Sequence, residues 1–499
     1  MSCAVKKYTY QRRKPEETPC YKIVQAELST FIQQRQLEGR PLPSYVIDEF
    51  EAYLRCGILA HGFLRLKCED CKEEKITAFS CKKRGFCPSC TGRRMSEAAI
   101  HLVDNILPMV PYRQFVITFP FQMRYWLNTN RQLFTQVHGI ITTEIQSFYE
   151  SQTSVKQSLE PKAGIVSFTQ RWGSALNLNS HLHIITTDGV HYRPEDPRFK
   201  KATKITNEKV AGLLSNIVQS ITILLKNSGY LSPEGELVDN PTIDPLFHEH
   251  QSINMATAAS IQGRIAFGPN AGKKVTRLGG SFGYAEEAPL FKGKLCYSMN
   301  GFSLHAARSI NTLDRKGLEQ LISYIARGPF SNDRLTLVPG RKVNLRLKRP
   351  FADGSTFVQF TYEEFLEKVS ALIPPPKSHL TRWSGSLAPN SKYRRKIILN
   401  PDEKKGFDFP DDPELSGKPN YSWAEVLSRV FGIDVLKCYC GGVFKPIAAV
   451  KDEEEARRYL RHVGLDHIPP ARAPPRGSVH MVDFDQTEDF QEEPVICLD

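Results

Sequence analysis

The alternation of apolar and polar positions divides the chain into helical and extended stretches. Apolar residues recur at the spacing of an amphipathic helix in six stretches: 21–31, 96–107, 132–149, 207–226, 314–326 and 452–463. Short apolar runs bounded by Pro, Gly or Asp predict strands over 114–119, 163–170, 181–187, 343–348 and 356–360. Ser96 is the expected N-cap of the second helix. Residues 229–298 give no clear pattern.

The connection between two of these strands is short. It runs from Arg171 to Ser180, which suits antiparallel pairing of 163–170 with 181–187. Strands that pair through short connections, mixed with separate helices, predict an α+β fold.

The distribution of charge along the chain indicates what kind of partner the protein binds. The 499 residues carry a formal net charge of +12, yet the tail 477–499 holds seven Asp and Glu and no Lys or Arg. The positive excess therefore falls on the rest of the chain, which favours a polyanion partner. No apolar stretch approaches the roughly 20 residues of a membrane span, and the N-terminus lacks the apolar core of a signal peptide. We expect no membrane association, and bunched cysteines indicate the reducing cytoplasm.

Composition and pattern together suggest seven segments. They are a basic arm (1–20), a helical zinc-binding and DNA-contacting domain (21–110), a catalytic domain (111–335), a basic β-containing extension (336–400), a linker (401–420), a small C-terminal region (421–476) and the acidic tail (477–499).

Six of the twelve cysteines lie between Cys56 and Cys90, and four of them form two C-x2-C pairs. Cys68 and Cys71, with Cys87 and Cys90, have the spacing of one structural four-cysteine zinc site. Cys56, His61 and Cys81 are spare candidates. Basic residues around the pairs suggest DNA contacts, although a solvated basic face would look the same: Lys82, Lys83, Arg84, Arg93 and Arg94. Cys438 and Cys440 have no second pair nearby in the sequence, and no metal is predicted there.

A pair of histidines lies at the head of the predicted strand 181–187. His181 and His183 are two residues apart, so both side chains project from one face of the strand. An H-x-H pair is more often accidental than ligating, but Gln170 can come alongside across the hairpin as a third ligand. Two imidazoles and one amide oxygen leave coordination positions open, which suits Mg²⁺ or Mn²⁺ polarising a phosphate.

Tyr324 lies near the end of the predicted helix 314–326. A core or interface tyrosine is the usual interpretation of such a residue. A tyrosine that attacks phosphorus needs a cation to stabilise the transferring phosphoryl group, and Arg327 is three residues away. Further basic residues are candidates for phosphate contacts: Arg341, Arg346, Lys348, Arg349, Lys392, Arg394, Arg395 and Lys396.

Four longer motifs resemble the insertion-sequence ninety-one family of bacterial transposases, within the histidine-hydrophobe-histidine nuclease superfamily. The motifs are Cys81-Lys-Lys-Arg-Gly-Phe-Cys-Pro-Ser-Cys90 with Arg93-Arg94, the run from Gln170 to His183 with Asp188-Gly189, Gly301-Phe-Ser-Leu-His-Ala306, and Tyr324-Ile-Ala-Arg-Gly-Pro329. The resemblance extends from about Tyr21 to Ile468.

This resemblance implies an N-terminal zinc-binding domain and a catalytic domain with a central antiparallel sheet flanked by helices. It implies His181 and His183 as metal ligands and Tyr324 as the nucleophile that forms a covalent 5′-phosphotyrosine, with rolling-circle movement of one strand. Founding members carry two tyrosines four residues apart, whereas Gln320 and Gly328 occupy those positions here. The chain is therefore closer to a single-tyrosine branch, and Gln320 competes with Gln170 for the third metal position.

Two other functions fit the same residues. A plasmid rolling-circle replication initiator or a conjugative relaxase would share the histidines and the tyrosine, and a non-enzymatic zinc-containing DNA-binding protein would use the histidines only structurally. Compared with these two alternatives, a transposase accounts better for the zinc module and the motif order. The expected partner is single-stranded DNA at element ends and target, with no small-molecule substrate, in the bacterial cytoplasm at the nucleoid.

Overall fold

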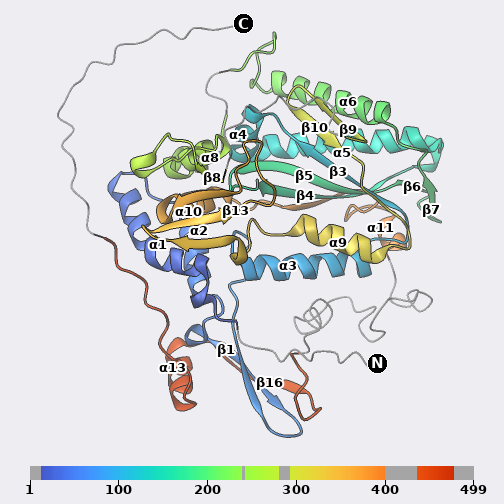
Figure 1. The fold of residues 1–499 in the computed structure, drawn as a ribbon. Coiled ribbons are helices and arrows are strands. Elements are labelled where there is room, and N and C mark those ends of the chain that lie inside the picture. Colours follow the sequence, from blue (N-terminus) through green and yellow to red (C-terminus); the bar gives the residue numbers. More distant parts are fainter. Residues whose placement is uncertain (1–12, 239–241, 280–292, 399–434, 477–499) are drawn as a thin grey trace, which may run out of the picture.

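The computed structural model describes residues 13–238, 242–279, 293–398 and 435–476 (Figure 1). The predicted linker 401–420, the acidic tail 477–499 and residues 1–12 of the basic arm lie outside the described residues.

An antiparallel sheet forms the centre of the molecule. Its strand order is β15-β4-β5-β3-β10-β9, with β11 also paired to β3. The strands are β3 (Tyr112–Thr118), β4 (Gly164–Trp172), β5 (Leu178–Thr187), β9 (Cys296–Met299), β10 (Phe302–His305), β11 (Ser309–Ile310) and β15 (Thr381–Gly385). The predicted pairing of 163–170 with 181–187 is confirmed, with Phe168 opposite His183. The α+β fold class and its central antiparallel sheet are confirmed as well.

Helices cover both faces of this sheet, because its strands are apolar on both sides. One face packs against α4 (Phe121–Thr129), α5 (Arg131–Thr153) and α6 (Asn207–Asn227), and the other against α3 (Pro88–His101) and α9 (Arg315–Ala326) (Figure 1). By length and composition alone, α6 could cross a membrane. Its apolar side, including Ile217 and Ile221, is instead buried in the core.

The start of α3 differs from the prediction. Ser96 lies inside the helix, where its hydroxyl donates to the Gly92 carbonyl, and Cys87 is the N-cap. Pro88 fits the first helical position because its fixed φ suits the first turn and its missing N–H would have no partner there. The helix continues as a π-helical turn, Leu102–Ile106.

A second body lies beside the central sheet. It combines α1 (Pro19–Leu37), α2 (Ser44–Arg55), α7 (Pro245–Glu249), α8 (Gln251–Ile261) and α10 (Tyr362–Leu372) with a sheet of order β12-β13-β14-β8. Those strands are Leu335–Val338, Lys342–Arg346, Phe357–Thr361 and Thr276–Leu278. Residues 336–400 are therefore not a separate extension, since β12 to β14 share a core with α1 and β15 completes the central sheet.

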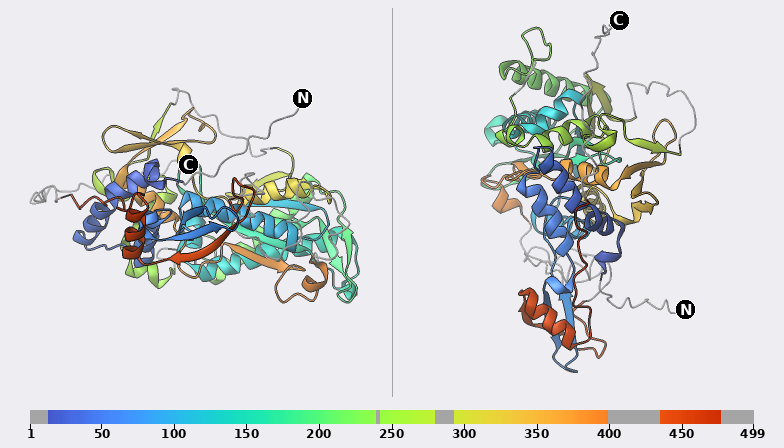
Figure 2. Two further views of the ribbon diagram at one scale, coloured as in Figure 1. Left: turned by 90° about the horizontal axis from the view of Figure 1, so that it is seen from below. Right: turned by 90° about the vertical axis from the view of Figure 1, so that its left-hand side faces the viewer.

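The C-terminal region 435–476 packs on the N-terminal domain and forms no unit of its own. Strand β16 (Phe444–Val450) pairs with β1 (Phe63–Cys68), which also pairs with β2 (Glu74–Ala78), and α13 (Glu453–His462) lies beside them. These elements form a lobe that projects from the body (Figure 2). The chain then returns along α1, where the Ala473 N–H donates to the Gln25 carbonyl.

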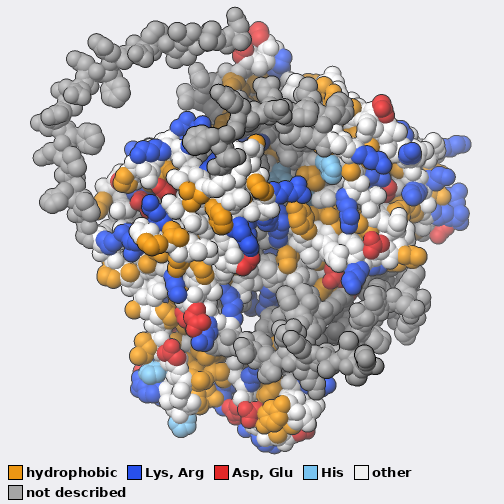
Figure 3. Space-filling view, in the orientation of Figure 1, with side chains coloured by type: hydrophobic (Ala, Val, Ile, Leu, Met, Phe, Trp, Pro, Cys, Tyr) orange, Lys and Arg blue, Asp and Glu red, His pale blue; other side chains and the backbone are white. Residues whose placement is uncertain are grey.

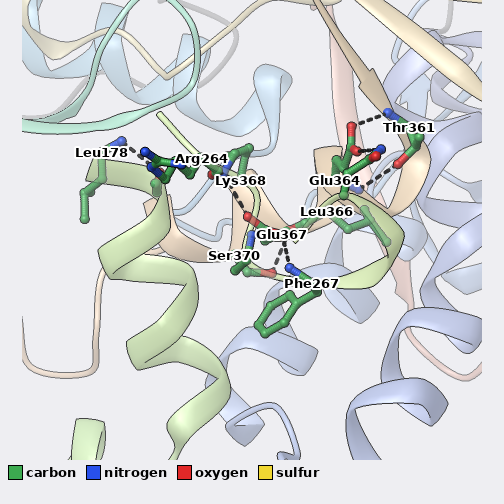
Figure 4. A network of polar contacts seen from close by, with 12 residues as sticks. Leu178, Arg264, Phe267, Thr361, Glu364, Leu366, Glu367, Lys368 and Ser370 are labelled. Carbon is green, nitrogen blue, oxygen red and sulfur yellow. Dashed lines mark hydrogen bonds and ion pairs between the residues drawn. The ribbon is translucent and has the colours of Figure 1, made fainter. Parts of the chain in front are cut away.

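Helix α10 carries a buried ion pair whose two side chains form hydrogen bonds with the loop after α8 (Figure 4). The Lys368 ammonium lies 2.8 Å from the Glu367 carboxylate, and both side chains are 1% exposed. Glu367 also accepts hydrogen bonds from the backbone N–H groups of Ala266 and Phe267. Lys368 donates to the Arg264 carbonyl.

Removing one partner of this pair leaves a buried charge without its counter-ion. We expect Lys368→Met to lower the free energy of unfolding by about 3 kcal/mol, measured by urea unfolding. The exposed Lys22→Met on α1 serves as the control and should change it by less than about 0.5 kcal/mol. A Lys368→Met variant as stable as this control would show that the pair contributes nothing.

Candidate active site and metal centres

Alternation along β5 places the two histidines on the face of the sheet covered by α9. Leu182 and Ile184 point into the core beneath α5 and α6, whereas Ile185 packs on the α9 side. His181 and His183 have the same parity as Ile185, so they project toward α9. Their ring centroids are 5.0 Å apart.

Hydrogen bonds at Nδ1 orient both rings. His181 Nδ1 lies 2.7 Å from the Asn179 carbonyl, which only accepts, so Nδ1 carries the proton and the Nε2 lone pair stays available. His183 Nδ1 accepts a hydrogen bond from Nε2 of Gln114 on β3 at 2.8 Å, so in this arrangement the proton of the neutral ring lies on Nε2. A turn of the Gln114 carboxamide that brings its oxygen to Nδ1 gives the other tautomer, in which the Nε2 lone pair can bind a metal ion. Such outer contacts are typical of metal-binding histidines.

Both imidazoles are held neutral. Burial lowers the pKa of His183 to about 3, with further lowering from His181 and from the Arg327 guanidinium. Burial also lowers the pKa of His181, and the positive charges of Arg327 and Arg124 act in the same direction. The neutral imidazole is the form that binds a metal ion.

Gln170 joins the histidines to helix α9. It is 3% exposed, lies opposite His181 in the β4–β5 register, and its Nε2 donates to the Ile325 carbonyl at 2.6 Å. That bond leaves the carboxamide oxygen as the atom that can face a cation. Gln320, the competing candidate, is exposed one turn before Tyr324.

Tyr324 lies on the exposed side of α9, in the last turn of that helix. The side chain is 52% exposed, its hydroxyl accepts a hydrogen bond from Arg327 Nη2 at 3.3 Å, and the guanidinium lies 4.0 Å from the ring centroid. Arg327 also lowers the pKa of both histidines, so one cation lies within electrostatic reach of the phenol and of the histidine pair.

Other cations gather around Arg327. Burial, Arg327 and Arg334 lower the pKa of Lys348 to about 8. Two backbone carbonyls, those of Arg346 and Ser174, hold the Arg334 guanidinium in place. Lys and Arg side chains are grouped near the middle of the face drawn in Figure 3. Such a group suits the phosphates of a nucleic acid.

The remaining DNA-contact candidates differ in their partners and exposure. Arg93, Arg341, Arg346, Lys392 and Lys396 each form an ion pair with a glutamate or an aspartate. The guanidinium of Arg394 lies 4.7 Å from the Trp383 ring centroid. Arg94 donates to the Lys82 carbonyl. Lys82, Arg84, Arg349 and Arg395 are exposed, and Lys83 is half-buried.

The cysteines form two clusters, and the predicted single site is wrong. Cys87 and Cys90 meet Cys56 and Cys81, whereas Cys68 and Cys71 meet Cys438 and Cys440. Sulfur–sulfur distances are 3.3 to 3.7 Å in the first cluster and 3.5 and 3.6 Å in the second. Tetrahedral zinc with bonds of about 2.3 Å separates its sulfurs by about 3.8 Å, so both clusters fit zinc.

Each cluster joins cysteines that are distant in the sequence, so spacing along one stretch of chain does not predict it. Cys71 and Cys438 are 367 residues apart and meet only because β16 pairs with β1. Cys438 and Cys440 therefore lie next to Cys68 and Cys71 of the β1–β2 hairpin. The prediction of no metal site at Cys438 and Cys440 is corrected accordingly. Among the described residues His61 belongs to neither cluster, and its Nδ1 lies 3.0 Å from the Glu453 carboxylate.

The first cluster supports the helix that carries the tyrosine. Cys87 caps α3 and Cys90 lies in its first turn. The end of α9 approaches this same turn so closely that a Cβ on Gly328 would lie 2.4 Å from the Thr91 hydroxyl oxygen. The turn of α3 that holds Cys87 and Cys90 therefore lies against the segment that follows Tyr324.

Comparison with known protein families gives two matches along the chain. Residues 23–119 match the family described as "Transposase zinc-binding domain", and residues 164–395 match the family described as "Putative transposase". Together these matches cover about two thirds of the chain. No curated protein and no solved structure matches the chain.

The two domains define a DNA-cleaving transposase with a zinc-binding module. The chain belongs to the insertion-sequence ninety-one family of transposases, and the resemblance drawn from its motifs is confirmed.

Proposed function

We propose that this transposase cleaves and rejoins single-stranded DNA through Tyr324, with a divalent cation held by His181, His183 and Gln170. One observation carries the proposal: Gln170 pairs with the strand of the histidines and bonds to the last turn of the tyrosine helix. The ligand set and the nucleophile are therefore fixed to each other through one buried side chain. Mg²⁺ or Mn²⁺ fits two imidazole nitrogens and one amide oxygen with positions left open, and when bound it polarises the scissile phosphate.

The chain's own groups account for the transfer. The Tyr324 oxygen bonds to phosphorus and the bond from phosphorus to the 3′ oxygen breaks, which leaves a 5′-phosphotyrosine and a free 3′-hydroxyl. The phenolic proton balances the charge on the departing 3′ oxygen. Arg327, within hydrogen-bond distance of the phenol, stabilises charge on the phosphoryl oxygens. A second 3′-hydroxyl reverses these steps and rejoins the strand, as rolling-circle movement of an element requires.

The test uses single-stranded oligonucleotides from the element ends, labelled at either terminus. We expect a covalent protein–DNA product when Mg²⁺ or Mn²⁺ is added, none without added cation, and none on the matched duplex. Binding without any covalent product would identify a non-enzymatic DNA-binding protein. Cleavage only at a plasmid origin, and not at element ends, would identify a replication initiator or relaxase instead.

Each cysteine cluster should hold one structural zinc. We expect two zinc ions per chain by metal analysis, and Cys440→Ser should reduce this to one, because three thiolates and a hydroxyl are a poorer ligand set. Cys296→Ser removes a cysteine outside both clusters and should leave two. Full zinc content in Cys440→Ser would contradict the second site.

The protein is expected to work in the cytoplasm, at the nucleoid. Arg327, Arg334 and Lys348 lie close together beside Tyr324, and a single strand suits them better than a duplex because cleavage needs an extended, accessible phosphate.

A further inference from the structure

A second group of cations lies on the opposite face of the central sheet from the histidines. Thr169 and Arg171 of β4, and Ser180 of β5, alternate with Gln170 and His181 and so project to the α4–α5 side. They form the floor of a cavity of about 230 Å³ that is closed by the segment 375–382. The cavity is thus one sheet thickness from the candidate active site.

The floor holds a buried guanidinium without an acidic partner. Arg171 is 8% exposed, its Nη2 donates to the Ala371 carbonyl at 3.2 Å, and its Nε is buried without a hydrogen-bond partner. No ion pair involves it in the part of the chain that the structure describes. A buried charge in this condition is costly unless an anion balances it.

Four more basic side chains surround the same space, and no Asp or Glu lines it: Arg131, Lys377, His379 and Arg382. The Asp244 carboxylate accepts from the backbone N–H of Arg131 and not from its guanidinium. Arg382 Nε is a second buried nitrogen without a partner, whereas its Nη1 and Nη2 donate to the Thr135 hydroxyl and its guanidinium lies 5.2 Å from the Phe134 ring centroid. The cavity therefore has the charge of an anion site.

Part of the cavity wall is apolar, which limits the kinds of anion that fit the cavity. Leu127, Phe134 and Pro375 line one part of the cavity while the cations line the rest. A simple inorganic anion has no apolar surface to pack against these side chains, whereas a nucleotide carries a flat base as well as its phosphate. The volume is below the roughly 300 to 1,000 Å³ of pockets for drug-sized ligands, which suits a single unit.

We propose that this cavity binds one nucleotide of single-stranded DNA, with its phosphate at Arg171 and Arg382 and its base against Phe134. The proposal rests on the proposed function in taking its ligand from single-stranded DNA. Strands β4 and β5 then bear DNA contacts on both faces, so that a strand held at this cavity is anchored next to the cleavage site. Arg131 and Lys377, exposed at the mouth, attract the phosphate.

The test measures binding of thymidine 5′-monophosphate to the full-length Tyr324→Phe protein by calorimetry, without added Mg²⁺ or Mn²⁺. We expect one site per chain, and about tenfold weaker binding of inorganic phosphate. The double variant Arg131→Gln/Lys377→Gln should weaken nucleotide binding about tenfold, because both charges lie at the mouth. The control Lys273→Gln/Lys274→Gln removes two exposed lysines elsewhere and should change it less than about twofold.

Three results would overturn the proposal. They are unchanged nucleotide binding in the double variant, phosphate binding as tight as nucleotide binding, and failure of a short single-stranded oligonucleotide to displace the nucleotide. The covalent cleavage assay is read separately on the wild type. If the wild type binds the nucleotide at the cavity but does not cleave DNA, the proposed function is contradicted and the proposed ligand of the cavity is not.

Discussion

Tyr324→Phe should form no covalent protein–DNA product while binding the same oligonucleotide as tightly as the wild type. The substitution removes only the oxygen that attacks phosphorus and keeps the ring beneath the Arg327 guanidinium. Because the side chain is half exposed, the free energy of unfolding should change by less than about 0.5 kcal/mol. Gel mobility of the denatured product and an equilibrium binding titration measure the two quantities.

Tyr192→Phe is the matched control. Tyr192 lies on β6 (Gly189–Tyr192), in a separate two-stranded sheet with β7 (Arg198–Lys201), and is likewise partly exposed. It should form the covalent product at the wild-type rate. If Tyr324→Phe still forms it, another tyrosine is the nucleophile.

His183→Ala should reduce cleavage at least about a hundredfold, because removing a metal ligand costs no less than disturbing the groups around it. DNA binding should stay within about threefold of the wild type, since it depends on Lys and Arg contacts to phosphates. Initial rates over a Mn²⁺ series measure the effect, and high Mn²⁺ should restore part of the lost rate.

His248→Ala on α7 removes an exposed histidine away from the sheet and should cleave normally. A His183→Ala variant with the wild-type rate and cation dependence would remove this histidine from the site. Gln170→Leu and Gln320→Leu, compared in the same series, decide the third ligand: we expect only the former to shift the Mn²⁺ dependence.

The strand face of the histidines could be predicted from the sequence because it depends on local alternation. Side chains two residues apart share a face, and the short connection between β4 and β5 fixes which residues pair, so Gln170 and His181 could be placed side by side. The periodicity of 314–326 likewise identified α9, observed as Arg315–Ala326.

The cysteine clusters could not be predicted in the same way because their ligands meet only in the folded chain. Cys68 and Cys440 are 372 residues apart, and nothing in their local spacing indicates the pairing of β1 with β16. Gln114 was missed for a related reason: its contact with His183 depends on β3 lying next to β5, a long-range pairing. Residues 229–298 gave no prediction, since α7, β8 and β9 are short and the buried side of α8 includes Ser252, Thr257 and Ser260, which hide its apolar period.

The most direct test of the account identifies the residue joined to DNA. The covalent product is formed with a single-stranded element-end oligonucleotide and Mg²⁺, digested with nuclease and protease, and analysed by mass spectrometry. The account predicts a phosphonucleotide on the peptide that contains Tyr324, linked through the 5′ phosphate, with a free 3′-hydroxyl on the released strand. A modified peptide containing any other tyrosine, or a 3′ linkage, would contradict it.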